Sequence, residues 1–381
     1  TKSKMGDDAF TQVTLVLGSA TAIMLLGSFV GSKHLSIDAR KGIAITYSKI
    51  VFPTMVFKGI AAIDIHKIDM NMALIILISK FIIVTLIYIF GLIVFYNKGR
   101  ISSAHAAALS LASTHSVDVS MGVPLAQVLF PEYIAYVYLN QTIQLVFINP
   151  ILIICMELAS TSTSTNGNKN GSRGGGFTAI RKGLISAALN PVFLMTCFGI
   201  IASEYYGTEG GSGGLPPLLK TICIQITSSG GFLGFLLLGF ALTDLSNTSK
   251  SEFGFVMVLN MFKIIILPFL YTTIPSLIFN IEKLPSKLPS LTFLNFLGCL
   301  PSAASVYSLC LTKKLSPRIV GPLIPITMIF STFFILSPLS SFLLSLVNFV
   351  KCFILISGVI GAIIALSSSS HDMDIEKDKQ N

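Results

Sequence analysis

The chain has 381 residues, of which 52% are hydrophobic and only 11% charged, and its mean hydropathy is +0.80. Soluble domains carry about 25% charged residues, so this composition cannot cover a water-exposed surface and excludes an ordinary soluble protein. The net charge of +9 does not indicate nucleic-acid binding, because the basic residues form no stripe and lie mostly between apolar runs. We therefore predict an integral membrane protein in contact with the lipid bilayer.

Apolar runs of spanning length follow one another along the chain, and they are continuous rather than alternating, which favours helices over a β-barrel. The runs fall at 11–32, 41–63, 70–96, 102–129, 133–158, 183–203, 215–243, 254–280, 291–312, 318–345 and 346–367. The predicted organisation is an N-terminal tail at 1–10, a five-helix unit at 11–158, a disordered Ser/Thr/Asn/Gly linker at 159–182, a second five-helix unit at 183–345, an extra helix at 346–367 and a polar tail at 368–381.

The distribution of Lys and Arg predicts which side of the membrane each loop faces. With the N-terminus outside the cytosol, the cytosolic loops hold 13 basic residues and the opposite segments hold 6. Because cytosolic loops carry the excess of basic residues, we expect a luminal or extracellular N-terminus and a cytosolic linker.

Two features recur in the second half of the chain at nearly the same offset. Lys80 and Lys263 are 183 residues apart, and Pro124 and Pro301 are 177 residues apart. An odd number of spans in each half inserts the halves in opposite orientations, as in many secondary transporters. We predict an all-α integral membrane fold of ten transmembrane helices, arranged as two inverted five-helix repeats, with an eleventh helix at the end.

The paired prolines predict that helices four and nine are broken and cross. Proline removes a backbone hydrogen bond and clashes with the preceding turn. Backbone groups freed in this way are tolerated inside a membrane only where they line a cavity or are buried in protein. A matched pair in two halves is typical of a transport site, and a simple kink without function is the alternative for each proline.

Charged and amide side chains inside the spans are candidates for ligand contact, because they are costly in hydrocarbon. Asp118, shortly before Pro124, is the first candidate, and the alternative is that it caps the second half-helix. Lys80 and Lys263 could attract an anion, pair with Asp118 or bond to unwound carbonyls. Gln144 is either a ligand contact or an interhelical hydrogen-bonding residue.

The sequence contains no pattern of a catalytic, metal or cofactor site. The six cysteines lie in apolar runs without CxxC spacing, the five histidines are scattered, and no nucleophile elbow, zinc-protease motif or P-loop occurs. We predict that the protein is not an enzyme and carries neither metal nor cofactor.

Several segments resemble the auxin efflux carrier (PIN-like) family over about residues 11–345. VDVSMGVP at 117–124 is similar to the first crossover of that family, and LPSAAS at 300–305 is similar to the second. PEY at 131–133 and NPI at 149–151 resemble, more closely, the transporter-like domain of lysosomal cholesterol-signalling proteins.

The resemblance implies a scaffold part and a transport part whose broken helices cross. It implies export of a small organic anion by alternating access for the carriers, or sterol sensing through partners for the lysosomal branch. The membrane is then lysosomal, another endomembrane or the plasma membrane, and a homodimer is one assembly that we consider. Together with the residue arguments, it gives as predicted substrate-binding residues Asp118, Pro124, Gln144, Lys80, Lys263, Pro301, Ser302 and Ser305.

Three positions depart from the patterns of these families. Val117 stands where the carriers have a crossover Asn, and Ile76 stands where plant carriers have a carboxylate, so auxin-like or dicarboxylate specificity is not expected. Ser19 replaces a carboxylate of the sterol-sensing branch. The run 346–367 matches the first helix of the receptor-like region in that branch, and we therefore expect this chain to be part of a longer protein.

Overall fold

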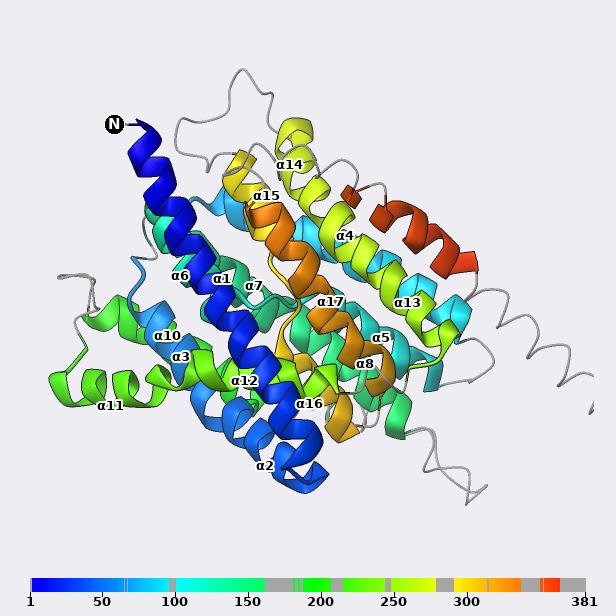
Figure 1. Cartoon of the computed structure of the whole chain (residues 1–381). Helices are drawn as coiled ribbons and strands as arrows, with labels where there is room; N and C mark the ends of the chain where they lie inside the picture. Colours follow the sequence, from blue (N-terminus) through cyan, green and yellow to red (C-terminus); the bar gives the residue numbers. More distant parts are fainter. Residues whose placement is uncertain are drawn as a thin grey trace, which may run out of the picture.

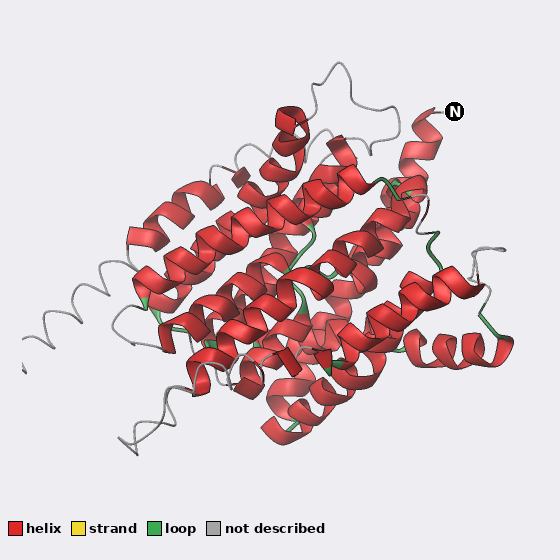
Figure 2. Cartoon of the chain, turned by 180° about the vertical axis from the view of Figure 1, so that it is seen from behind, coloured by secondary structure: helices red, strands yellow, loops and turns green. Residues whose placement is uncertain are grey.

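The structure is a computed structural model, and its described residues are 2–64, 66, 68–95, 101–161, 181, 184–185, 188–206, 215–243, 248–278, 291–313, 315–336, 350–351 and 353–363. Within these ranges the regular structure is helical, and the one β-type pairing is an isolated bridge between Ser116 and Ser302 (Figure 2). Most of the predicted linker at 159–182, and the whole polar tail at 368–381, lie outside the described residues.

The α-helices are α1 Lys2–Lys33, α2 Ile37–Thr46, α3 Phe52–Ala61, α4 Met70–Val94, α5 Ile101–Thr114, α6 Val123–Leu129, α7 Ile134–Ile143, α8 Asn149–Thr161, α10 Pro191–Tyr206, α11 Pro217–Ser228, α12 Gly230–Leu242, α13 Lys250–Met261, α14 Leu267–Ile278, α15 Leu291–Cys299, α16 Ala304–Lys313 and α17 Pro317–Leu336. Five-residue π-helical turns join some of them, at Tyr47–Val51 (η1), Asp118–Gly122 (η4), Gln144–Ile148 (η6) and Phe262–Ile266 (η9). Helix α1 begins inside the predicted N-terminal tail.

Seven helices in the described part of the chain are long and apolar enough to cross a membrane. They are Phe10–Lys33, Ile37–Ala61, Met70–Val94, Pro131–Glu157, Pro217–Leu242, Lys250–Pro275 and Pro317–Leu336. Pro191–Tyr206 and Phe353–Ile363 are shorter apolar helices. The prediction of an all-helical integral membrane protein is thereby confirmed, while the full ten-helix inverted repeat stays a prediction.

Local sequence explains where several helices begin. Ser36 caps α2 and Asp69 caps α4, each by accepting a hydrogen bond from a backbone N–H of the first turn. Ser249 and Glu252 form a reciprocal capping box at the start of α13. These caps satisfy N–H groups that have no partner within the helix itself.

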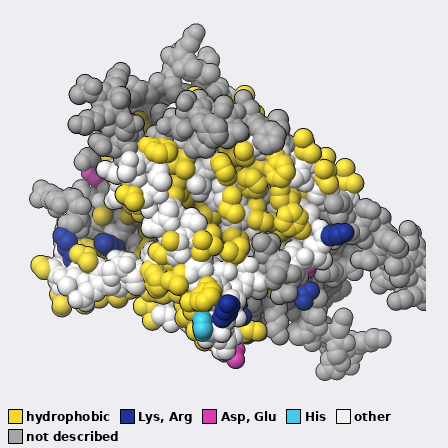
Figure 3. Space-filling model, in the orientation of Figure 1, with side chains coloured by type: hydrophobic (Ala, Val, Ile, Leu, Met, Phe, Trp, Pro, Cys, Tyr) yellow, Lys and Arg dark blue, Asp and Glu magenta, His cyan; other side chains and the backbone are white. Residues whose placement is uncertain are grey.

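Most of the close helix contacts lie in two regions, which α12 and α17 join by packing against each other. Helix α1 packs along α12, and α3 packs against α10 and α11. Elsewhere α4 and α8 pack against α5, α13 packs against α17, and α14 packs against α4 and α15. Figure 1 shows α3, α10 and α11 at one side of the molecule and α4, α13 and α14 at the other. In Figure 3 hydrophobic side chains cover much of the visible face, with Lys and Arg near its margins, as expected of a surface in contact with lipid.

Close approach of α1 and α12 depends on glycine. A Cβ atom at Gly27 would lie 2.4 Å from the carbonyl oxygen of Leu236, and one at Gly239 would lie 2.1 Å from that of Met24. Neither distance is compatible with a side chain, so these glycines set how closely the two helices pack.

We expect Gly27→Leu to force α1 away from α12 and to lower the free energy of unfolding by roughly 1–3 kcal/mol or more, the cost of overpacking. The matched control is Gly18→Leu on the same helix, because nothing lies within 4 Å of a Cβ atom there. Thermal unfolding in detergent micelles measures both variants. Equal midpoints for the two would contradict this account of the α1–α12 contact.

Candidate functional site

The centre of the molecule contains two extended segments that run antiparallel to each other. One follows α5 at 115–117 and the other follows α15 at 300–303. The Val117 N–H donates to the Pro301 carbonyl (2.9 Å), and the Ala303 N–H donates to the His115 carbonyl (2.9 Å). Each helix break therefore supplies hydrogen-bond partners for the other, which satisfies backbone groups that cannot reach water inside a membrane.

The two prolines of the predicted site have different positions relative to these breaks. Pro301 lies within the extended segment, after α15 has ended at Cys299. Pro124 lies at the second position of α6, directly after the π-helical turn η4, and the helical backbone continues through it, because the Val123 N–H donates to the Asp118 carbonyl. The expectation that Pro124 itself interrupts the span is therefore wrong in detail, because the break lies upstream of it, at 115–117.

Asn140 of α7 lies at the centre of a buried hydrogen-bond network. Lys80 donates from Nζ to the Asn140 carbonyl (3.0 Å) and to Gln144 Oε1 (3.0 Å). The Asn140 side chain donates to Asp118 Oδ1 (2.9 Å) and accepts at Oδ1 from the Tyr271 hydroxyl (2.8 Å). Lys80 and Asp118 are thus joined through Asn140 rather than by a direct ion pair. Lys80 does bond to a backbone carbonyl, but to one within α7 rather than to the unwound carbonyls considered for it, since the Asn140 carbonyl also accepts from the Gln144 N–H.

A second set of contacts extends this network to the other half of the chain. Lys263 donates from Nζ to the Ser116 hydroxyl, within the first extended segment. The Gln144 amide donates to Asn149 Oδ1 (2.9 Å). Lys80 and Lys263 are each 0% exposed. Lys80 and Lys263, the two lysines that suggested an internal repeat, therefore both donate hydrogen bonds to polar groups beside the crossing.

One of the two carboxylate oxygens of Asp118 accepts no hydrogen bond from the described residues. Its Oδ2 atom is buried and has no hydrogen-bond partner among the described residues, and the side chain is 1% exposed. No side chain caps the turn η4 that begins at Asp118, so the geometry does not support the capping alternative. A cavity of about 10 Å³ adjoins Asp118 and Ser305, which is close to the space that one water molecule needs.

Each of the π-helical turns in the described part of the chain carries a polar residue of this region. Lys49 lies in η1, Asp118 in η4, Gln144 in η6 and Lys263 in η9. A π-helical turn inserts an extra residue into a helix and changes the direction in which the following side chains point, and such turns are frequent at functional sites.

A cavity of about 630 Å³ opens beside the crossing, within the size range of small-molecule sites. Its walls combine apolar side chains such as Phe52 and Phe193 with polar ones, and no Asp or Glu of the described part of the chain lines it. The polar lining residues are Ser48, Lys49, His115, Asn149, Asn190, Ser305, Ser308 and Lys313. Lys313 also pairs with the Glu157 carboxylate.

The structure separates the predicted site residues by position. Ser305 lines both cavities, and Asp118 lines the smaller one. The side chains of Lys80, Gln144 and Lys263 are fully buried near the crossing. Pro124 lies in the first turn of α6. The Ser302 N–H donates to the Thr327 hydroxyl (3.2 Å) and its own hydroxyl has no partner among the described residues.

Sequence reasoning did not select Tyr271, Ser116 or Lys49 for the site. Tyr271 is a phenol within the apolar run 254–280, and buried phenols usually find a partner, so this signal was available. Lys49 carried the same signal as Lys80 and Lys263, a charge inside a predicted span. Ser116 carried none, because its position depends on the crossing.

We expect Asn140→Leu to destabilise the protein, because it removes the donor to Asp118 and the acceptor of the Tyr271 hydroxyl. Each buried group left without a partner costs roughly 1–3 kcal/mol. Thr142→Val is the control on the same helix, since its hydroxyl bonds only to the Tyr138 carbonyl of the preceding turn. Chemical denaturation in detergent compares the variants, and a loss no greater for Asn140→Leu than for Thr142→Val would remove Asn140 from the centre of the network.

No protein-family model matches the chain. The chain is similar to a mouse (Mus musculus) protein, the lysosomal cholesterol signaling protein, with 22% identity over 268 residues. The matched region covers 69% of this chain and 30% of the mouse protein. The predicted resemblance to lysosomal cholesterol-signalling proteins is confirmed as a similarity, whereas membership of the PIN-like family stays a prediction.

Proposed function

We propose that this chain is a PIN-like carrier that binds a small organic anion in its 630 Å³ cavity and moves it by alternating access. The observation that carries the proposal is the antiparallel crossing of two helix breaks with Lys80, Lys263 and Asp118 buried around it. Paired broken helices beside a cavity are the arrangement expected of an inverted-repeat transporter. The ten-span repeat fold is part of the same proposal.

Charge favours an anionic ligand. With all three buried groups ionised, two ammonium groups face a single carboxylate, and an uncompensated buried charge costs several kcal/mol. The large cavity adds Lys49 and Lys313 without an acidic lining residue, and Lys313 already pairs with Glu157. Lys49 is therefore the best-placed cation for direct contact with a ligand carboxylate.

The position of the cavity fits an alternating-access movement. One wall comes from η1, α3 and the start of α10, through residues such as Phe52 and Phe193. The opposite wall comes from α5, α8 and α16, through residues such as Leu111, Ile153 and Leu309. Because the cavity lies between these two walls, a small rotation of the helices of one wall against those of the other would change the access to the cavity.

A second candidate function is sensing of a sterol or other lipid without turnover, acting through partners. The name of the mouse relative, the lysosomal cholesterol signaling protein, favours it. That name also supports a lysosomal or other endomembrane location, for which we propose a luminal N-terminus.

Reconstitution separates the two functions. The purified chain in liposomes is given radiolabelled benzoate and lactate in separate assays, two monocarboxylates outside the auxin-like and dicarboxylate classes, with cholesterol binding measured in parallel. Saturable uptake of either anion supports the carrier. Cholesterol binding without uptake supports the sensor, and absence of binding and uptake for every probe contradicts both.

We expect Asp118→Asn to reduce flux at least roughly tenfold, the change that 1.4 kcal/mol represents, and to flatten its pH dependence. The physical reason is that Asn can neither exchange a proton nor balance the two buried lysines. The control is Asp38→Asn, at an exposed residue of α2 whose side chain is 94% exposed. Wild-type flux and pH profile in Asp118→Asn would show that transport does not need the charge or the proton of the Asp118 carboxylate.

We expect Lys49→Gln to weaken binding of an anionic probe by roughly threefold to tenfold while leaving an uncharged probe unaffected, because it removes a cation from the cavity wall. Lys41→Gln is the matched control, since Lys41 pairs with Asp38 and does not line the cavity. Isothermal titration of purified protein measures the affinities. Equal losses in both variants would indicate a general surface-charge effect.

A further inference from the structure

A small pocket lies where α2, α12 and α16 meet. It has a volume of about 100 Å³, and its lining includes Arg40, Tyr307 and Ser308 beside apolar residues such as Phe240. No Asp or Glu of the described part of the chain lines it. Complete small-molecule sites measure about 300–1,000 Å³, so this pocket has room for one charged group of a ligand rather than for a whole molecule.

Arg40 has hydrogen-bond donors that the described residues do not use. Its Nη1 atom donates to the Thr243 hydroxyl (3.0 Å), whereas Nε is buried and has no partner among the described residues. No carboxylate in that part of the chain forms an ion pair with Arg40. A buried donor without a partner is costly, and the edge formed by Nε and Nη2 is one through which arginine binds an oxyanion with two parallel hydrogen bonds. The pocket therefore suits an oxyanion.

The Arg40 side chain is held between α1 and α12. A Cβ atom at Gly31 of α1 would lie 3.6 Å from Arg40 Cδ and 2.8 Å from Phe240 Cδ1, so the missing side chain at Gly31 leaves room for both. An arginine that only anchored its helix at the membrane surface would direct its charged end into water. Arg40 instead buries Nε at the pocket, which favours a bound partner over a simple anchor.

The pocket lies at the level where three candidate membrane spans begin or end. These spans are Phe10–Lys33, Ile37–Ala61 and Pro217–Leu242. Gly31, Arg40 and Phe240, which lie against one another, are each within three residues of a span end. The ends of spans lie at the headgroup layer of the bilayer, so phospholipid phosphates are oxyanions within reach of the pocket.

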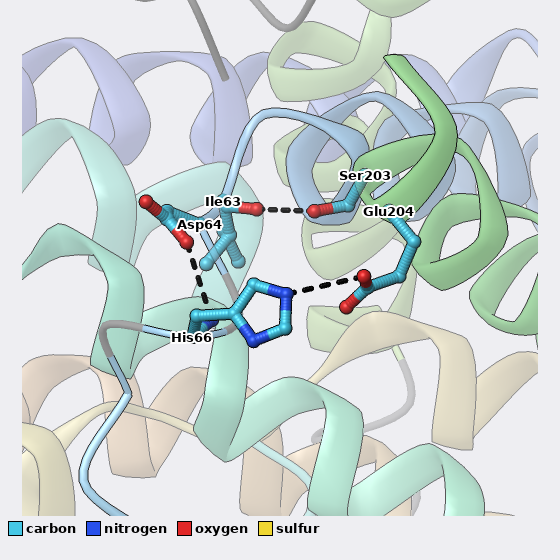
Figure 4. A network of polar contacts seen from close by, with 5 residues as sticks. All are labelled: Ile63, Asp64, His66, Ser203 and Glu204. Atoms are coloured by element: carbon cyan, nitrogen blue, oxygen red, sulfur yellow. Dashed lines mark hydrogen bonds and ion pairs between the residues drawn. The ribbon is translucent and has the colours of Figure 1, made fainter. Parts of the chain in front are cut away.

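Charged pairs at the two ends of the span Ile37–Ala61 support this placement. Near its first residue, Asp38 pairs with Lys41, and the Asp38 side chain is 94% exposed. Beyond its last residue, His66 Nε2 lies 3.2 Å from Glu204 Oε2 (Figure 4), and the His66 side chain is 81% exposed. Solvent-exposed charge therefore marks both ends of this span, and Arg40 lies at one of them.

The charges around the pocket select among phospholipids. A zwitterionic headgroup adds an ammonium group, for which the described lining offers no carboxylate. Lys33 and Lys41 lie near the same span ends and add positive charge. On the proposed topology this end of the molecule faces the cytosol, and the cytosolic leaflet carries the anionic lipids. We propose that this pocket binds the phosphate of an anionic phospholipid, whose oxygens accept hydrogen bonds from Arg40.

The pocket shares two of its helices with the central cavity. Helix α2 contributes Arg40 to the pocket and Ile45 to the cavity, and Ser308 of α16 lines both. A phosphate held between α2 and α16 favours the separation of these helices that suits it, so the lipid biases the state of the cavity. This consequence rests on the proposed carrier function, whereas the lipid site itself does not.

Protection of Arg40 from chemical modification tests the site on the full chain. The chain is reconstituted in phosphatidylcholine vesicles with or without phosphatidic acid, and the reaction of each arginine with phenylglyoxal is followed by mass spectrometry. We expect phosphatidic acid to slow modification of Arg40 roughly threefold to tenfold and to leave Arg318 unchanged. Arg318 is the internal control, because it is exposed and lines neither this pocket nor the central cavity.

Two further samples in phosphatidylcholine alone identify the source of the oxyanion. Protection of Arg40 by inorganic phosphate, without protection by phosphatidic acid, would assign the pocket to a soluble anion and overturn the lipid site. Protection by benzoate alone would do the same and place Arg40 on the path of the transported anion. Equal rates for Arg40 in every sample, or equal slowing at Arg318, would also overturn the proposal.

Arg40→Gln provides a second test, by native mass spectrometry of the purified chain with phosphatidic acid. The fraction of protein that carries the lipid should fall roughly tenfold, because Gln has neither the charge nor the paired donors of arginine. Lys41→Gln is the matched control, since it removes the same charge at a residue that pairs with Asp38 and does not line the pocket. Equal losses in the two variants would contradict a specific site at Arg40.

Benzoate flux is measured in the same vesicles as the protection of Arg40. Protection without flux contradicts the carrier function and leaves the lipid site in place. Flux without protection contradicts the lipid site and leaves the carrier function in place.

Discussion

The rest of this structure depends on the need to pair backbone hydrogen-bonding groups where water is absent. A helix break in a membrane exposes N–H and C=O groups that lipid cannot satisfy. Here two breaks lie side by side and pair with each other, through Val117 with Pro301 and His115 with Ala303. Neither segment could keep its extended form alone, so each half of the chain requires the other. This mutual requirement fixes the point around which the polar side chains gather.

The same constraint governs the charged residues. Lys80 and Lys263 are fully buried, and both direct their ammonium groups at oxygen atoms near the crossing. Asn140 joins Lys80 to Asp118 through its backbone carbonyl and its side-chain amide. Among the described residues, Asp118 Oδ2 and the hydroxyls of Ser302 and Ser305 have no hydrogen-bond partner, so polar atoms beside the crossing remain open to a proton or a ligand group. This combination, rather than any single residue, makes the region a candidate for ion or ligand coupling.

The sequence carried part of this information. The matched lysines and prolines predicted two related halves and two helix breaks. Charged residues and prolines are rare inside apolar spans, so each single one is informative. The exact location of the first break, and the joining of Lys80 to Asp118 and Tyr271 through Asn140, were not readable. They depend on π-helical turns and on a crossing between segments almost two hundred residues apart, and neither leaves a periodic pattern in the chain. The pocket at Arg40 likewise exists only once α2, α12 and α16 pack.

Carrier and sensor need not be exclusive functions of this fold. The central cavity and the groove between α3, α10 and α11 are both lined by residues of the same pair of helices, α3 and α10. A ligand shifts a conformational equilibrium only by the difference in its affinity for the two states. If movement of this pair changes both spaces, a membrane lipid and an anion each favour the conformation that suits them, and linkage makes the effect reciprocal. A protein that retained the groove while losing movement of the anion would then report on a membrane lipid without transporting anything.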